Sequence, residues 1–177
     1  MVRLCPVCDA YEAVGKKIGV VGPAHAALTE ALFLRDYSSD VCILARGRED
    51  IGKPALQKAA GAGIEFWDYA SVNVGASRLE VVMRDGTRRP LNIIYSAMGC
   101  DVRSELATSL GVDCDATGYI LVGAHLETSV PGLYAIGDVA KALNQIAVGF
   151  GHAALAAAQI NSALSKRGSF DPMRIRA

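Results

Sequence analysis

The sequence lacks several features that would assign it to a functional class directly. Basic and acidic side chains are equal in number, 18 of each, so no excess of positive charge points to nucleic acid or to an anionic membrane. It also lacks an apolar run of about 20 residues, the length of a membrane-spanning helix. The first residues, Met-Val-Arg-Leu-Cys, do not resemble an apolar signal-peptide core. We therefore expect a cytoplasmic protein that binds neither nucleic acid nor a membrane.

Cysteine is scarce, and its spacing excludes two further classes. Five cysteines are scattered over 177 residues, which is not the pattern of a secreted disulfide framework. Only Cys5 and Cys8 lie close together, with no second pair and no finger-spaced histidines, so we predict no metal site. A lone C-x-x-C beside a strand–helix pattern is typical of a dithiol/disulfide redox pair, and Asp9 could carry its proton. The alternative is two unpaired thiols on a loop.

Hydrophobic periodicity predicts alternating strands and helices in the first part of the chain. Apolar runs at 16–22, 40–44 and 64–67 have the length of buried strands, and helical patterns at 24–37 and 55–62 separate them. This order is the signature of a parallel sheet with right-handed crossovers. Asp85-Gly86, between apolar segments at 79–83 and 88–95, predicts a hairpin. We therefore expect an α/β fold, a Rossmann-like three-layer nucleotide-binding domain with an antiparallel β insertion, whose last strand, 93–97, returns to the main sheet.

The organisation changes after about residue 101. Short strands are expected at 118–122 and 133–136, followed by an alanine-rich helix at 147–164. We divide the chain into a first domain, residues 1–114, and a second part, residues 115–177.

A dinucleotide fingerprint lies between the first predicted strand and the first helix. The sequence Gly-Pro-Ala-His-Ala-Ala at 22–27 has the G-x-G-x-x-A spacing. Gly22 would make the tight turn, Ala27 would let the helix pack on the strand, and a pyrophosphate would lie at the helix N-terminus beside His25. Ala24 replaces the glycine that admits the phosphate, and the preceding proline lacks an N–H. The alternative is an ordinary strand–helix turn.

The end of the second predicted strand bears on the choice of cofactor. A domain that prefers NAD usually has an acid there to accept from the ribose 2′-hydroxyl. This chain has Arg46 and Arg48 instead, with no acid before Glu49. Guanidinium groups suit a 2′-phosphate, so we predict NADP. The alternative is that both arginines are solvated surface charges.

Together these motifs resemble bacterial thioredoxin reductase and the related flavoprotein component of alkyl hydroperoxide reductase. In that family a C-x-x-C-D motif, here at 5–9, precedes the fingerprint strand, and residues 128–138 look like its second FAD motif. The resemblance implies that electrons pass from NADPH via FAD to the Cys5–Cys8 disulfide and on to a thioredoxin-like or other disulfide protein. Asp9 would be the acid.

The same resemblance assigns flavin contacts to the second part of the chain. Asp138, in the motif with Gly137, would bind the ribityl chain, and Gln145 and Ile146 would begin the segment under the isoalloxazine ring. The family starts with a further G-x-G-x-x-G unit, which this sequence does not contain before Cys5. Residues 115–177 would then be an incomplete remnant of the FAD-binding domain.

Two expectations follow from that remnant. The isolated chain should bind little FAD, and its uncovered apolar faces should make it at least a homodimer. Whether the chain is an enzyme by itself stays open, because two alternatives remain. It could be a stand-alone nucleotide- or dithiol-binding module without flavin turnover, or one half of a split flavoenzyme.

Overall fold

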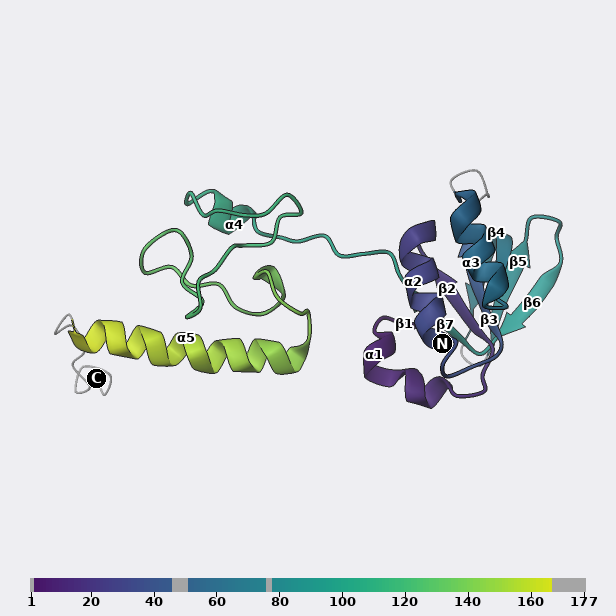
Figure 1. Ribbon diagram of the computed structural model, residues 1–177, viewed down its shortest axis with the longest axis horizontal. Coiled ribbons are helices and arrows are strands. Elements are labelled where there is room, and N and C mark those ends of the chain that lie inside the picture. The colour runs from purple at the N-terminus through teal and green to yellow at the C-terminus, as the bar shows by residue number, and fades with distance from the viewer. Residues whose placement is uncertain (1, 46–50, 76–77, 167–177) are drawn as a thin grey trace. The chain divides into compact units, whose positions relative to one another are not determined.

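A computed structural model describes residues 2–45, 51–75 and 78–166 of the chain (Figure 1). Contacts between Cα atoms divide the chain into two compact units, residues 1–100 and 101–177. Over the described residues, no helix combines the length and the apolar character needed to cross a membrane.

The first unit contains a seven-stranded sheet with the order β1-β7-β2-β3-β4-β5-β6. Its strands are β1 (Val2–Arg3), β2 (Ile18–Val21), β3 (Val41–Ala45), β4 (Glu65–Val74), β5 (Leu79–Met83), β6 (Arg88–Leu91) and β7 (Ile93–Ser96). Its helices are α1 (Pro6–Asp9), the 3-10 helix η1 (Ala10–Ala13), α2 (Ala24–Leu34) and α3 (Lys53–Gly61).

The sheet is parallel on one side and antiparallel on the other. Strands β1, β7, β2, β3 and β4 pair in parallel, whereas β4–β5 and β5–β6 are antiparallel. The long strand β4 serves both halves, and its register shifts between Tyr69 and Ser71, where a bulge lets it bend. Strand β7 returns to the parallel half between β1 and β2. The α/β fold and the antiparallel insertion are therefore confirmed.

Two apolar clusters fill the two faces of the parallel half. On one face, Ile18, Val20 and Ile43 pack against α2 and α3, which lie on the same side of the sheet (Figure 1). On the other face, Leu44 and Ile94 pack against side chains of the β4–β6 meander. The alternation along β2, β3 and β7 produces both cores, because successive side chains of a strand point to opposite faces.

The hairpin segment expected at 88–95 and the returning strand expected at 93–97, which overlap in the sequence, are the separate strands β6 and β7. Asn92 separates β6 from β7, and its side-chain Oδ1 accepts from the backbone N–H of Lys17 at 2.8 Å. Its own N–H donates to the Lys17 carbonyl at 2.9 Å. These contacts with the residue before β2 turn the chain from the meander into the parallel sheet.

The second unit has little regular structure apart from one long helix. Its elements are α4 (Glu105–Thr108), the 3-10 helix η2 (Gly137–Val139) and α5 (Ile146–Lys166). The strands expected at 118–122 and 133–136 are wrong, because Ile120 and Tyr134 form only isolated bridges. Apolar runs of strand length become strands only where neighbouring strands accept their hydrogen bonds.

A small apolar core nevertheless holds the second unit together. Val112, Ile120, Ala135 and Ala140 are buried together, with Cys114 packed against them. The boundary at residue 100/101 therefore precedes the expected one after residue 114, because Val112 and Cys114 pack with residues later in the chain. The turn after Cys114 is ordered by Asp115, whose pKa is lowered mainly by hydrogen bonds from Thr117.

Candidate functional site

The C-x-x-C pair lies at the beginning of α1 and is joined as a disulfide. Cys5 is the N-cap residue of this helix, with an extended backbone, and Pro6 follows at a position where a helix tolerates proline. The Cys8 N–H donates to the Cys5 carbonyl at 3.0 Å, which brings the two Cα atoms to 5.3 Å. Cys8 is exposed and Cys5 is half-buried, so solvent and a protein partner can reach the pair.

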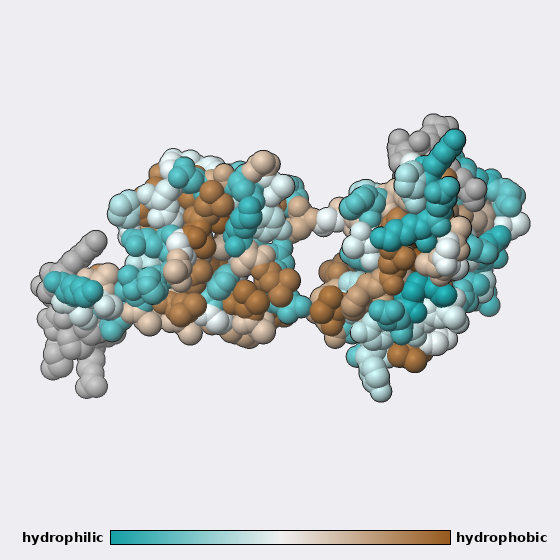
Figure 2. Space-filling view, in the orientation of Figure 1, coloured by the Kyte–Doolittle hydropathy of each residue, from teal (hydrophilic) through white to brown (hydrophobic). Residues whose placement is uncertain are grey.

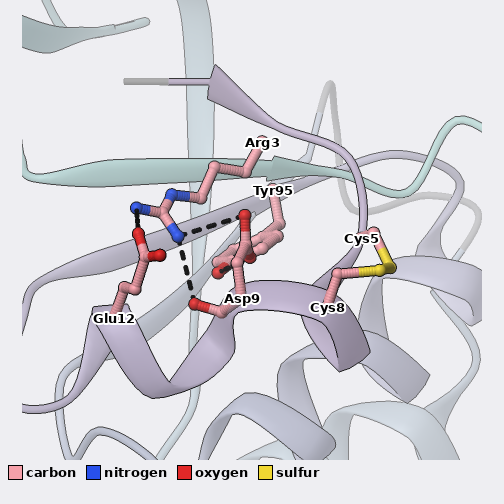
Figure 3. A network of polar contacts seen from close by, with 6 residues as sticks. All are labelled: Arg3, Cys5, Cys8, Asp9, Glu12 and Tyr95. Carbon is pink, nitrogen blue, oxygen red and sulfur yellow. Dashed lines mark hydrogen bonds and ion pairs between the residues drawn. A yellow bond between two sulfur atoms is a disulfide. The ribbon is translucent and has the colours of Figure 1, made fainter.

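Asp9 follows the disulfide and faces away from it, toward the sheet (Figure 3). Its Oδ1 accepts from the Tyr95 hydroxyl at 2.6 Å. Its Oδ2 lies 3.1 Å from Nη1 of Arg3, and the same Arg3 nitrogen donates to the Asp9 backbone carbonyl at 3.0 Å. Both carboxylate oxygens of Asp9 therefore contact groups from outside α1.

Arg3 and Tyr95 reach Asp9 together because of the sheet register. They are partners in the parallel pairing of β1 with β7, and register partners on neighbouring strands point to the same face. Arg3 also donates through Nη2 to Glu12 in η1 at 2.7 Å. One guanidinium thus connects the carboxylates of two consecutive short helices, a use of its forked donors that lysine could not copy.

Tyr95 is the largest fully buried side chain of the described residues. Burial raises its pKa to about 12, and the hydrogen bond to Asp9 adds to the rise. The phenol is therefore a proton donor to Asp9 throughout the physiological range. The sequence analysis missed Arg3, Glu12 and Tyr95. A signal for Tyr95 was present, since a tyrosine in an otherwise aliphatic strand needs a partner for its hydroxyl.

The fingerprint loop lies at the carboxyl end of β2, where a nucleotide is expected to bind. An ideal Cβ built on Gly22 would lie 2.3 Å from the Ala97 carbonyl oxygen, so this position requires glycine. Helix α2 begins at Ala24 and has no side-chain cap at its N-terminus. Ala27 is fully buried against the sheet, whereas His25 is exposed.

The remaining predicted nucleotide residues, Arg46 and Arg48, lie outside the described residues.

The predicted flavin residues gather where η2 meets the beginning of α5. Gly137 has a left-handed backbone (φ 70°), and its N–H donates to Nδ1 of His152 at 3.2 Å. Asp138 is exposed beside it, and Ile146 is 81% exposed at the first position of α5. Gln145 is half-buried. An exposed carboxylate at η2 and an exposed apolar side chain at the beginning of α5 are groups that suit a ligand with hydroxyls and an apolar ring. The sequence analysis missed His152.

One hollow in the described part of the chain belongs to neither site. It measures about 550 Å³ and is lined by residues of β4, β5 and β6, among them Trp67 and Arg89, and by Arg84 in the turn after β5. Size alone does not mark this hollow as functional, because Arg84 is paired with Asp68 at 2.8 Å and none of the predicted site residues lines it. Among the described residues, no group of three metal-ligating side chains is close enough to hold an ion.

Fold and site together define a class of protein. It has a Rossmann-type α/β unit, a dinucleotide-type loop after β2, and a disulfide helix packed onto the same sheet. The sequence profile of the pyridine nucleotide-disulphide oxidoreductase family matches residues 1–159. The chain belongs to this family.

Individual relatives refine the likeness to thioredoxin reductases. The thioredoxin reductase of Mycoplasma genitalium is 27% identical over 158 residues, which cover 82% of this chain and 50% of the relative. That of Mycoplasmopsis pulmonis is 30% identical over 146 residues, covering 78% of this chain and 47% of the relative.

Solved structures agree. The thioredoxin reductase from Streptococcus pyogenes MGAS5005 superposes with a TM-score of 0.80 at 26% identity, covering 93% of this chain and 57% of that one. The crystal structure of HlmI superposes with a TM-score of 0.83 at 25% identity, covering 97% of this chain and 55% of that one. The chain thus spans about half the length of the proteins it resembles.

Proposed function

We propose that the chain passes electrons from NADPH, via FAD, to the Cys5–Cys8 pair and then to a protein disulfide, as a thioredoxin-reductase-like oxidoreductase. The observation that carries this proposal is the accessible Cys5–Cys8 disulfide, anchored through Asp9 to a strand of a Rossmann-type sheet. A dithiol in a helix N-terminus is suited to exchange, because the helix end favours a thiolate.

The step that the chain's own residues perform is thiol–disulfide exchange. A thiolate of the reduced pair attacks one sulfur of the partner's disulfide and forms a mixed disulfide. The second cysteine of the pair then displaces the partner. The partner leaves with two thiols, the Cys5–Cys8 bond forms again, and two electrons and two protons have moved to the partner. In this proposal Asp9 assists the proton movement at the neighbouring Cys8.

Two cofactors belong to the proposal. NADP would bind at the loop of Gly22, Ala24, His25 and Ala27, and Arg46 and Arg48 would contact its 2′-phosphate. FAD would be held by Gly137, Asp138, Gln145 and Ile146, and when bound it supplies the group that accepts hydride and reduces the disulfide. On this view the nucleotide domain, predicted as residues 1–114, corresponds to the unit of residues 1–100, and the flavin domain, predicted as residues 115–177, corresponds to residues 101–177.

A second candidate function concerns residues 1–177 taken by themselves, which span about half the length of the relatives. If the isolated chain binds little FAD, it would act as a dithiol- or nucleotide-binding module, or as one half of a split flavoenzyme. A visible absorption spectrum after FAD titration separates these cases. A stoichiometric flavin spectrum on the isolated chain would exclude them in favour of the complete reductase.

The central experiment isolates the dithiol step from the cofactors. The chain is reduced with dithiothreitol, freed of reductant, and mixed with an oxidised thioredoxin, and thiols on both proteins are then counted by alkylation and mass spectrometry. We expect one disulfide of the partner to be lost for each Cys5–Cys8 pair formed. Cys8→Ser should abolish this transfer, and Cys100→Ser is the matched control. No transfer from the wild-type chain would contradict the proposal.

The cofactor preference has its own test. Calorimetry with NADPH and NADH on the wild type and on Arg46→Ala should show tighter binding of NADPH, and the mutation should remove the difference. Equal affinities in the wild type would remove the argument from the two arginines. The likeness to thioredoxin reductases supports a thioredoxin-like protein as the partner, and a cytoplasmic location remains part of the proposal.

A further inference from the structure

The disulfide helix is connected to the rest of the unit by a small charged network (Figure 3). The network consists of Arg3, Asp9, Glu12 and Tyr95. Its contacts span 86 positions of sequence between Asp9 and Tyr95, whereas α1 itself has only four residues. A helix of one turn cannot hold its own shape in water, so the geometry of the cysteine pair depends on these outside contacts.

The network is also unbalanced in charge. It holds two carboxylates, Asp9 and Glu12, and one guanidinium, whose distances to the two acids are 3.1 and 2.7 Å. The Arg3 side chain is 19% exposed, so water screens its charge less than that of a surface arginine. Reduction of the disulfide adds a thiolate to the same short helix that carries Asp9. Without Arg3, that helix and the following η1 would carry the new negative charge together with two carboxylates that no guanidinium neutralises.

We propose that Arg3 and Tyr95 are positioning residues for the dithiol chemistry: Tyr95 anchors Asp9, and thereby α1, to strand β7, and Arg3 supplies the positive charge that stabilises the reduced pair. The proposal depends on the proposed electron transfer only for the biological role of the two residues. The effect itself belongs to the equilibrium between disulfide and dithiol, which can be measured without a cofactor or a partner.

The equilibrium to measure is exchange with dithiothreitol. Its two thiols are oxidised to the cyclic disulfide, the Cys5–Cys8 bond breaks, and two electrons and two protons pass to the cysteines. The ratio of reduced to oxidised dithiothreitol at half reduction reports the stability of the reduced pair. Wild type, Arg3→Met and Arg3→Lys are compared at pH 6 and pH 9, with Tyr11→Phe as a matched control, since Tyr11 is in η1 and is 83% exposed.

Arg3→Met should need a ratio about threefold to tenfold higher at pH 9, the size expected for one charge in a partly screened site. At pH 6 the difference should shrink, because few cysteines are then thiolates. Arg3→Lys loses the forked contact but keeps the charge, so its ratio should lie closer to the wild type than that of Arg3→Met. Tyr11→Phe should match the wild type. If Arg3 had a purely structural role, Arg3→Met and Arg3→Lys would change the dithiothreitol ratio by the same factor, and equally at pH 6 and pH 9. That result, or an unchanged ratio in Arg3→Met, would overturn the role of the charge.

The anchor is tested by combining substitutions. Tyr95→Phe removes one hydroxyl and keeps the buried ring, so the unit should remain folded, as circular dichroism can check. In this background Asp9 is less constrained, and Arg3→Met should change the ratio by less than about twofold, because coupled residues are not additive. Full additivity would overturn the anchoring role. Failure of the wild type to reduce thioredoxin would instead contradict the proposed function and leave these equilibria interpretable.

Discussion

Cys42 and Cys8 show how the environment of a residue decides the reactivity of the same functional group. Cys8 is exposed in the disulfide, whereas Cys42 is 2% exposed in the middle of β3. Burial, with a smaller contribution from Asp40, raises the pKa of the Cys42 thiol to about 12. The thiolate is the reactive species, so Cys42 should be inert although nothing covalent protects it.

We therefore expect iodoacetamide at pH 8 to modify Cys100 in the native, air-oxidised protein and to leave Cys42 unmodified. Cys100 is free and exposed. Mass spectrometry of the peptides, before and after unfolding in urea, measures both sites, and Cys42 should react only after unfolding. The prediction also requires that Cys5 and Cys8 stay paired with each other. A disulfide from either of them to Cys100 or Cys114 would contradict it.

Glu30, on α2, is a second residue whose chemistry is set by its environment. Its Oε2 is buried and has no hydrogen-bond partner among the described residues, and burial raises its pKa. The folded protein therefore holds the proton more tightly than the unfolded chain. The stability gained in this way is complete below the ordinary carboxyl pKa and is lost as the pH rises through the raised value.

Glu30→Gln should accordingly raise the unfolding temperature at pH 7 and have little effect at pH 3, where the wild-type carboxyl is already neutral. We expect a gain below about 1 kcal/mol, because the side chain keeps part of its contact with water and screening reduces the cost of the charge. Thermal unfolding followed by circular dichroism at the two pH values checks this. Asp101→Asn, at an exposed position of the second unit, is the control. A loss of stability at pH 7 would mean that Glu30 has a partner.

At the scale of elements, the junction of β2, α2 and the segment after β7 is the most constrained point of the nucleotide loop. The Ala97 N–H donates to the Val21 carbonyl at 2.7 Å, which draws the chain after β7 across the end of β2. Gly22 then faces the Ala97 backbone, and backbone atoms cannot rotate out of the way as the end of a side chain can. Glycine at position 22 is therefore required both by the tight turn of the fingerprint and by its packing against the segment after β7.

Gly22→Ala should destabilise the first unit by about 1–3 kcal/mol, the usual cost of overpacking. The new methyl would meet the Ala97 carbonyl oxygen at 2.3 Å. Urea unfolding measures the free energy, and Gly61→Ala is the matched control, because a Cβ there would meet nothing within 4 Å. Equal stability of the two variants would show that the loop can shift to relieve the contact.

At the scale of the whole molecule, the second unit leaves much apolar surface uncovered. Figure 2 shows such patches on its surface. On α5 only Ala156 is buried, whereas Ile146 and Phe150 are 81% and 74% exposed. They are four positions apart and so lie on one side of the helix. A separate hollow of about 430 Å³ is lined by apolar residues, among them Leu106, Leu110 and Leu133.

Exposed patches of this kind mark association sites, so we expect the isolated chain to be at least a dimer at micromolar concentration. Light scattering measures the mass of the particle. Phe150→Glu should shift it toward the monomer, and Ser162→Glu, an equal change of charge at an exposed position on the other side of α5, should not. A monomeric wild type whose second unit resists protease would defeat the expectation, since the unit would then be stable by itself.

The sequence alone determined the features that depend on local spacing. The order of strands and helices in residues 16–97 follows from periodicity, which each segment carries within itself. The Cys5–Cys8 pairing follows from a separation that one helical turn can close. The glycine of the fingerprint follows from the turn that it must make.

Tertiary structure alone decided the contacts between distant segments. The meeting of Asp9 with Arg3 and Tyr95 depends on the register of β1 with β7, and no local pattern contains a register. The apolar runs at 118–122 and 133–136 show that a local pattern by itself does not make a strand. Their composition favours strands, yet in this chain they form only isolated bridges. A strand exists only where another strand completes its hydrogen bonds, and that is a property of the assembled fold rather than of the segment.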